Sequence, residues 1–135
     1  GYLEGTALKK PPLVEYYYKD DALHDPLLCL GHLEELGVVT PEELAEATRM
    51  ARKVNDILQR FFSERGLILV DFKLEFGRDG AGNIVLGDEI SPDTCRLWDA
   101  QTQEKLDKDR FRRDLGGVEE AYAEVLRRIV PESAP

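Results

Sequence analysis

The chain has 135 residues, 42% of them hydrophobic and 33% charged, so it has enough apolar side chains for the core of one folded domain. Its formal net charge of −9 opposes non-specific binding to nucleic acid, which depends on Lys and Arg contacts with phosphates. The longest apolar run, residues 66–70, falls short of the roughly 20 residues of a membrane-spanning helix. With two cysteines and no pattern of a secretory signal in its first residues, the sequence predicts a cytoplasmic protein that binds neither nucleic acid nor membranes.

The first part of the chain favours irregular structure. Residues 1–12 form a lead-in that ends in two prolines, which lack a backbone donor. Residues 13–19 contain three consecutive tyrosines and favour a strand. Asp20-Asp21 and residues 24–26 are turn-forming, so we expect the strand to end before them.

The clearest helix begins at Thr40. Thr40 and Glu43 have the spacing of a capping box, and Pro41 suits the first helical position. Apolar residues then recur at spacings of three and four: Leu44, Ala47, Ala51, Val54, Leu58 and Phe61. Gly66 is suited to end the helix. We expect this helix to serve structure and not chemistry.

After Gly66 the apolar period changes to two. The alternating apolar residues are Val70, Phe72, Leu74 and Phe76, and the charged residues between them are Asp71, Lys73 and Glu75. In one strand the two sets point to opposite faces. Residues 77–83 suit a hairpin connection and residues 84–90 a returning strand. The sequence therefore predicts a hairpin whose open face carries a row of charges.

Three further elements complete the predicted fold. Arg96-Leu97-Trp98 begins a short extended segment, residues 107–114 favour a helix, and a last helix follows Gly116-Gly117 and ends before Pro131. The order of helix, hairpin and helices indicates an α+β fold, with an antiparallel sheet packed against helices on one face. We expect residues 1–135 to form a single domain.

The charged residues of the hairpin are the first candidates for chemistry. A solvated sheet surface is one explanation for Asp71, Lys73 and Glu75. The returning strand supports a second, because it adds Asp88, and two acids from adjacent strands can share a divalent cation. Lys73 could then neutralise a phosphate or a carboxylate. Glu75 and Asp88 share a face only if opposed residue numbers add up to an odd value, and the sequence leaves this register open.

Other reactive side chains are weaker candidates. His24, Cys29 and His32 lack a spacing typical of metal ligands, so we do not predict zinc. Cys95 has no evident base partner, which argues against a nucleophilic role.

Five segments of the chain carry a family pattern. They are residues 19–26 (KDDALHDP), 69–77 (LVDFKLEFG), 87–99 (GDEISPDTCRLWD), 107–111 (DKDRF) and 115–118 (LGGV). In their order and spacing they resemble SAICAR synthetase, the phosphoribosylaminoimidazole-succinocarboxamide synthase family of purine biosynthesis. Five ordered segments are a more specific signal than one short motif. The resemblance implies an ATP-grasp-like fold.

The resemblance also implies a reaction and a site. ATP phosphorylates the carboxylate of carboxyaminoimidazole ribonucleotide, and the amine of L-aspartate then displaces phosphate to form an amide. By match to the family segments, Glu75 and Asp88 are expected to bind Mg²⁺ and the ATP phosphates. Lys73 is expected to stabilise the transferring group or the substrate carboxylate, and Arg96 to bind the ribonucleotide phosphate.

The remaining residues implied by the resemblance surround the same substrates. Asp71, Asp93 and Asp25 are expected to contribute to substrate binding, and Lys108 and Asp109 to act near the pocket, on the side of L-aspartate.

Family members carry an additional N-terminal lobe that helps to hold ATP. We do not find that lobe in these residues, so we expect the chain to represent the C-terminal part of the fold. We also expect it to be inactive by itself and to self-associate through apolar surface that the lobe covers. The alternative hypothesis is a non-catalytic nucleotide-binding or assembly module derived from the same fold.

Overall fold

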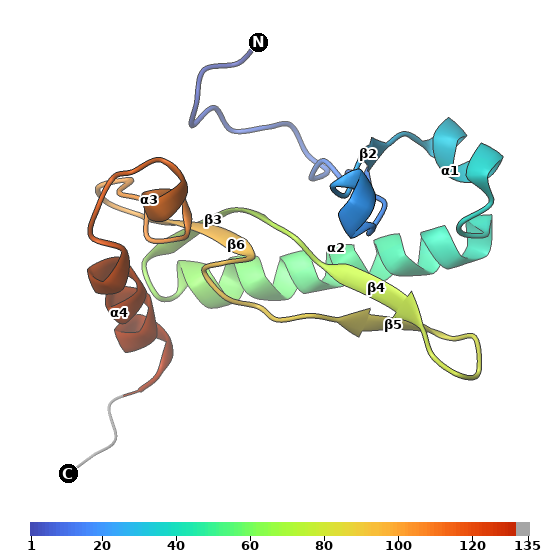
Figure 1. The fold of residues 1–135 in the computed structure, drawn as a ribbon. Helices are drawn as coiled ribbons and strands as arrows, with labels where there is room; N and C mark the ends of the chain where they lie inside the picture. The colour runs from blue at the N-terminus through green and yellow to red at the C-terminus, as the bar shows by residue number, and fades with distance from the viewer. Residues whose placement is uncertain (132–135) are drawn as a thin grey trace. The chain divides into compact units, whose positions relative to one another are not determined.

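The computed structural model describes residues 1–131 (Figure 1). The chain divides into two compact units, Gly1–Arg52 and Lys53–Pro135, which are described separately below. No helix within the described range is both long and apolar enough to cross a membrane. The single ATP-grasp-like domain over residues 1–135 stays a prediction.

The first unit consists of short elements after an irregular lead-in. Its elements are β1 (Tyr16–Tyr17), the 3₁₀-helix η1 (Asp21–Leu23), β2 (Leu27–Leu28), α1 (Leu30–Leu36) and the beginning of α2 (Pro41–Ser63). The strand expected over residues 13–19 is only two residues long, because β2 offers it only two partners, Leu28 and Leu27. The turn that follows is the predicted one, and the side chain of Asp20 accepts a hydrogen bond from the backbone N–H of Leu23.

Helix α2 begins with the predicted capping box. The backbone N–H of Glu43 donates to Thr40 Oγ1 at 3.1 Å, and the backbone N–H of Thr40 donates to Glu43 Oε1 at 2.9 Å. The helix ends at Ser63, and one further turn leads to Gly66, whose φ of 69° is in the left-handed region. The short helix α1 was not predicted. Leu30, Leu33 and Leu36 recur every three residues, but seven residues are fewer than the window over which periodicity identifies a helix.

The second unit contains two separate pairs of antiparallel strands, followed by two helices. Its elements are β3 (Leu67–Phe72), β4 (Glu75–Arg78), β5 (Ile84–Gly87), β6 (Cys95–Asp99), α3 (Asp109–Arg112) and α4 (Val118–Ile129). Strand β3 pairs with β6, and β4 pairs with β5 (Figure 1). This mixture of helices and antiparallel strands is the predicted α+β class.

The prediction of one continuous strand over residues 70–76 is wrong. The strand ends at Phe72, and β4 begins at Glu75 with a different partner. The cause lies across the ladder, because residues 88–94 contain bends and a turn at residues 92–94 and offer no strand to pair with. In that segment the backbone N–H groups of Thr94 and Cys95 both donate to Ser91 O. The predicted row of charges on a single face is therefore divided between two strand pairs.

A β-bulge in β3 determines which way Asp71 points. Leu69 is opposite Leu97, but Asp71 is opposite Arg96, so Val70 is an extra residue in the ladder. The extra residue reverses the alternation of faces. As a result Phe72 packs against the same core as Leu69, while Asp71 is exposed beside Arg96.

The core of the second unit forms where α2 and α4 meet the β3–β6 pair. Its buried residues are Phe62, Leu67, Leu69, Cys95, Leu97, Leu106, Ala121 and Val125. Tyr122 and Ile129 from the predicted stripe of α4 pack against this cluster. The core fixes β6 and the segment after it, which carry three of the candidate site residues, Arg96, Lys108 and Asp109.

Candidate functional site

Arg96 lies between two carboxylates from different elements. Its Nη1 donates to Asp71 Oδ2 of β3 at 2.7 Å, and its Nε donates to Asp109 Oδ2 of α3 at 3.0 Å. The side chain of Arg96 remains 45% exposed, whereas that of Asp109 is only 10% exposed. The guanidinium group is therefore held in one orientation but stays accessible to a ligand.

Asp109 joins two arginines. Its second oxygen, Oδ1, accepts from Arg112 Nη1 at 3.0 Å. Burial opposes ionisation of this carboxyl group, but the hydrogen bond from Arg112 and the charge of Arg96 outweigh it, and the pKa of Asp109 is lowered. Asp109 is thus a charged anchor for Arg96.

Lys108, the residue before Asp109, has no such anchor for its side chain. Among the described residues, no hydrogen-bonding or ionic partner contacts the side chain of Lys108, whose backbone N–H donates to Pro92 O.

Asp93 is attached to the same region by helices α3 and α4. The hydroxyl group of Tyr122 donates to Asp93 Oδ1 at 2.5 Å, and Arg112 Nη2 donates to Asp93 O at 3.4 Å. Burial and the hydrogen bond to Asp93 raise the pKa of Tyr122, so the phenol stays protonated and donates. The structure therefore connects Asp71, Asp93, Arg96 and Asp109 through direct contacts and through Arg112.

Lys73 and Glu75 form a second, smaller group. Lys73 Nζ donates to Glu75 Oε1 at 3.1 Å. Glu75 is opposite Gly87 in the β4–β5 ladder, so the opposed residue numbers add up to an even value. Asp88 lies one residue beyond this last pair and has a left-handed backbone with φ of 64°. Strand alternation therefore does not determine the direction of its side chain, and the convergence of Glu75 and Asp88 stays a prediction.

Asp25 belongs to the first unit and has a structural partner there. Its Oδ1 accepts from the backbone N–H of Asp20 at 2.8 Å, which closes the turn around η1. The backbone of Asp25 is left-handed, with φ of 47°. Its proposed contact with substrate stays a prediction.

The weaker candidates have structural roles. His32 Nδ1 accepts from the backbone N–H of Cys29 at 3.4 Å at the start of α1. Cys95 belongs to the core, and burial raises the pKa of its thiol, which disfavours the nucleophilic thiolate. No group of three or more His, Cys, Asp or Glu side chains in the described part of the chain could hold a metal ion.

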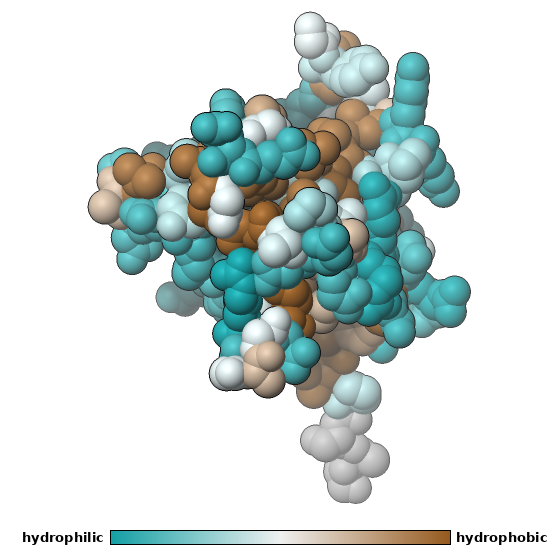
Figure 2. All heavy atoms as spheres, turned by 90° about the vertical axis from the view of Figure 1, so that its right-hand side faces the viewer, coloured by the Kyte–Doolittle hydropathy of each residue, from teal (hydrophilic) through white to brown (hydrophobic). Residues whose placement is uncertain are grey.

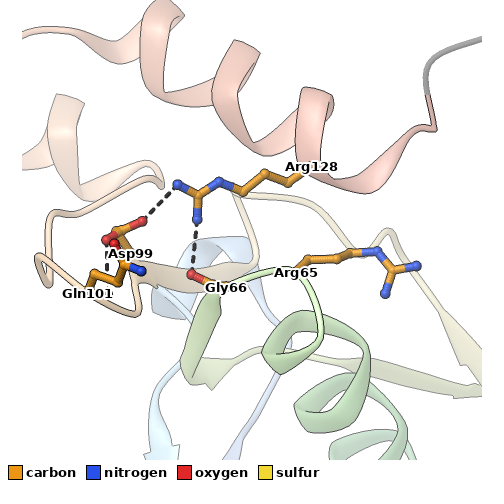
Figure 3. A pocket seen from close by; sticks show the side chains of 5 residues that line it. All are labelled: Arg65, Gly66, Asp99, Gln101 and Arg128. Carbon is orange, nitrogen blue, oxygen red and sulfur yellow. Dashed lines mark hydrogen bonds and ion pairs between the residues drawn. The ribbon is translucent and has the colours of Figure 1, made fainter.

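A cavity of about 250 Å³ lies at the other end of β6 (Figure 3). It is lined by Arg65, Gly66, Asp99, Gln101 and Arg128. Arg128 donates to Gly66 O at 3.0 Å and to Asp99 Oδ1 at 2.7 Å, so its guanidinium group joins α4 to the ends of β3 and β6. Because none of the predicted site residues lines this cavity, we assign it a structural role.

Comparison with known proteins identifies the family of this arrangement. The SAICAR synthetase family model matches residues 1–129. The chain belongs to the SAICAR synthetase family. It is 62% identical to a phosphoribosylaminoimidazole-succinocarboxamide synthase from Chlorobium chlorochromatii over 130 residues, which are 96% of this chain and 54% of the relative. It is 60% identical to the Chlorobaculum parvum enzyme of the same name, over 98% of this chain and 55% of the relative.

Solved structures of SAICAR synthetases have the same fold. A SAICAR synthetase in complex with ADP gives a TM-score of 0.90 at 51% identity and covers 99% of this chain and 57% of its own. The enzyme from Pyrococcus horikoshii gives a TM-score of 0.84 at 50% identity and covers 94% of this chain and 55% of its own. The chain spans about half the length of the curated relatives that it matches.

The sequence of this SAICAR synthetase family member did not predict three of the side chains that support Arg96 and its partners. They are Asp107, Arg112 and Tyr122, and all three act through residues that were selected. Tyr122 was assigned only to the apolar stripe of α4, because periodicity does not reveal where a phenol hydroxyl points. The sequence does hold a signal for Asp107. An Asp just before a helix often accepts a hydrogen bond from the backbone N–H two residues later, here that of Asp109.

Proposed function

We propose that this chain forms part of a ligase that joins L-aspartate to carboxyaminoimidazole ribonucleotide and hydrolyses ATP. The observation that carries the proposal is the exposed guanidinium group of Arg96, held by Asp71 and Asp109, in a chain of the SAICAR synthetase family. The name of the curated relatives, phosphoribosylaminoimidazole-succinocarboxamide synthase, describes this product. ADP in a solved structure with a TM-score of 0.90 supports ATP as the nucleotide substrate.

Arg96 would bind the phosphate group of the ribonucleotide. A guanidinium group has planar, paired donors that match phosphate oxygens, and it stays charged at every working pH. Asp71 and Asp109 hold Nη1 and Nε, so the cation needs little further ordering when the ligand arrives. Asp93 and Asp25 would contribute to the same substrate pocket.

The reaction needs activation of a carboxylate, because a carboxylate oxygen is a poor leaving group. The substrate carboxylate oxygen attacks the γ-phosphorus of ATP, and ADP leaves with the pair of electrons from the broken bond. The amine nitrogen of L-aspartate then attacks the acyl carbon, the C–O bond to phosphate breaks, and the nitrogen loses a proton. Lys73 would neutralise charge on the transferring phosphoryl group, while Lys108 and Asp109 would act on the side of L-aspartate.

A magnesium ion that arrives with ATP would need few ligands from this chain. Mg²⁺ is usually held by one or two carboxylates together with substrate phosphates and water, so a cluster of three protein ligands is not required. Glu75 in β4 and Asp88 directly after β5 would supply the carboxylates. The bound ion would neutralise charge on the ATP phosphates during transfer.

The localisation that we propose is the cytoplasm. Both cysteines are free thiols, Cys29 exposed and Cys95 buried, which is typical of a reducing compartment. Fractionation of cells that express the tagged protein would test this assignment.

The test of the function uses a fusion enzyme, in which this chain is joined to the segment of the Chlorobaculum parvum relative that lies outside the matched residues. We expect it to form the amide product from ATP, Mg²⁺, L-aspartate and the carboxylated ribonucleotide, with one ADP released per product. Omission of L-aspartate should abolish the product. Binding of ADP without any product under saturating substrates would contradict the proposal and favour the non-catalytic module.

A further inference from the structure

Asp107 is the only fully buried charged side chain in the described part of the chain, with an exposed fraction of 0%. Each of its carboxylate oxygens has a backbone partner. Oδ2 accepts from the N–H of Leu97 at 2.8 Å, and Oδ1 accepts from the N–H of Asp109 at 2.7 Å. A buried carboxylate is unfavourable unless such donors compensate it, so these two bonds explain why an acid occupies the position.

The two backbone partners of Asp107 belong to Leu97 and Asp109, and both are linked to the ion pair of Arg96 with Asp109. Leu97 follows Arg96 in β6, and Asp109 is the residue that accepts from Arg96 Nε. On this edge of β6 the backbone carbonyl of Leu97 accepts from the N–H of Leu106, while its N–H is bound by the Asp107 carboxylate. One carboxylate thus sets the distance between the strand that carries Arg96 and the helix that carries its partner.

We propose that Asp107 is a positioning residue that holds Asp109, and through Asp109 the guanidinium group of Arg96, in the orientation that binds the phosphate of the substrate. The inference rests on the proposed function for the identity of that ligand. Asp107 itself does not touch the substrate, since it has no exposed surface.

The chemistry of the position explains why other side chains would not serve. Burial raises the pKa of Asp107, while the two N–H donors favour its ionised form. An asparagine offers one oxygen and one NH₂ group, and the NH₂ group cannot accept from a backbone N–H. Replacement by Asn therefore leaves one of the two backbone groups without its acceptor and loosens either β6 or the start of α3.

The experiment compares Asp107→Asn with unchanged fusion enzyme by initial-rate kinetics. We expect KM for the ribonucleotide to rise about tenfold or more, as loss of a charge-assisted contact predicts. KM for ATP should change by less than about threefold, because Lys73, Glu75 and Asp88, the residues assigned to ATP, do not contact Asp107. Asp107→Ser, which keeps an oxygen for the N–H of Asp109, replaces Asp107→Asn if that variant does not fold.

Asp99→Asn is the matched control. Asp99 is also an acid of β6 that accepts from backbone N–H groups, those of Gln101 and Thr102, but it lies at the other end of the strand and binds Arg128. We expect it to lower the melting temperature without raising KM for the ribonucleotide. An equal rise in KM in both variants would assign Asp107 a general structural role and overturn the proposal.

A double-mutant cycle separates this inference from the proposed function. If Asp107 acts through Arg96, Asp107→Asn should raise KM no further in an Arg96→Lys background. Independent effects of the two substitutions would overturn the inference and leave the function intact. An Arg96→Lys enzyme with unchanged KM for the ribonucleotide would instead contradict the assignment of Arg96 to the phosphate.

A readout that does not depend on activity is the Nε–H signal of Arg96 in proton–nitrogen correlation spectra of the fusion enzyme. The hydrogen bond to Asp109 should slow its exchange with water. We expect the exchange to accelerate in Asp107→Asn and to stay unchanged in Asp99→Asn. Unchanged exchange in Asp107→Asn would overturn the inference even if no product were formed by any variant.

Discussion

At the scale of single residues, Arg96 is both anchored and accessible. Asp71 and Asp109 hold it from two elements, and 45% of its side chain is still exposed. A cation that is fixed before the ligand arrives loses less side-chain entropy on binding than a free surface arginine. The same two carboxylates partly neutralise the positive charge of Arg96, so the proposed binding of phosphate would depend on the geometry of the guanidinium fork more than on charge alone.

Arg96→Lys tests this dependence on geometry. Lysine keeps the charge, but its single ammonium group cannot contact Asp71, Asp109 and a phosphate with the same directions. We expect KM for the ribonucleotide in the fusion enzyme to rise roughly 10- to 100-fold, with KM for ATP changed less than about threefold. Initial-rate kinetics with each substrate varied in turn measure this. Equal increases in every KM would indicate a folding defect.

Glu75→Gln tests the proposed magnesium ligand. Glu75 forms an ion pair with Lys73, whose side chain is largely exposed, and such a pair contributes at most about 1 kcal/mol to stability. The melting temperature should therefore change little. Turnover should fall roughly 100-fold, because charge stabilisation at the transferring phosphoryl group is lost. The exposed α4 acid Glu119, changed to Gln, is the control and should retain full turnover. Parallel losses of activity and melting temperature would make Glu75 a structural residue.

We expect Asp99 to contribute to the stability of the fold in a way that depends on pH. Backbone N–H groups, chiefly that of Thr102, and the guanidinium group of Arg128 lower the pKa of Asp99 well below its usual range. A lowered folded-state pKa stabilises the fold above the unfolded pKa of about 3.9, and this contribution is lost as the pH falls further. Urea unfolding at pH 5 and pH 3, values chosen to bracket that pKa, should show a smaller loss of stability in Asp99→Asn than in the unchanged chain. An identical loss in both would refute the assignment.

At the scale of elements, local signals predicted α2 and α4 well but missed the short helix α1. The capping box of Thr40 and Glu43 and the glycines before Val118 lie where α2 and α4 begin. Helix contacts are local, so spacing and caps carry most of the information. The strand over residues 70–76 was mispredicted because β6, the partner of β3, is distant in sequence. Alternation cannot reveal the bulge at Val70 or the change of partner after Phe72.

The same limit applies to the candidate site. The family segments pointed to Asp71, Arg96 and Asp109, but not to the contacts among them, since the bulge at Val70 alone brings Asp71 opposite Arg96. Asp107 escaped selection because its role depends on complete burial and on two backbone groups. A sequence pattern identifies reactive side chains more readily than the residues that orient them.

The connection between β4 and β5 offers a matched pair of substitutions. Gly82 has φ of 83°, a conformation that strains any residue with a Cβ atom, whereas Gly80 in the same turn has no such requirement, and neither is crowded. Gly82→Ala should lower the free energy of unfolding by about 1 kcal/mol, and Gly80→Ala should raise it slightly or leave it unchanged. Urea unfolding measures both. Equal destabilisation by the two would show that the turn has another conformation in solution.

At the scale of the whole molecule, many large apolar side chains lie at the surface, as Figure 2 shows for one face. The most exposed in the first unit are Leu3, Tyr2 and Leu13, and in the second unit Phe111 and Leu126. Exposed apolar surface is consistent with a chain that spans about half the length of its curated relatives. Self-association of the chain stays a prediction, which sedimentation at several concentrations would test.

The chain alone should form less than about 1% of the product that the fusion enzyme forms. Phosphoryl transfer needs reacting groups held roughly 3–3.5 Å apart and shielded from water. The candidate residues in this chain provide Arg96, Lys73 and two carboxylates, but the relatives use nearly twice its length. ATP bound by half of the family's fold would stay mobile, and the acyl phosphate would be open to hydrolysis.

The measurement is product formation by the purified chain, before and after addition of the separately expressed segment from the Chlorobaculum parvum relative. Recovery of activity only after addition would show that each half contributes groups that the other lacks. Inorganic phosphate should be followed in the same assay, because a chain that activates the carboxylate but cannot protect it would release phosphate without amide. Full-rate amide formation by the chain alone would mean that the essential groups all lie within its 135 residues. In that case the segment of the Chlorobaculum parvum relative would not be needed for the reaction, contrary to our expectation.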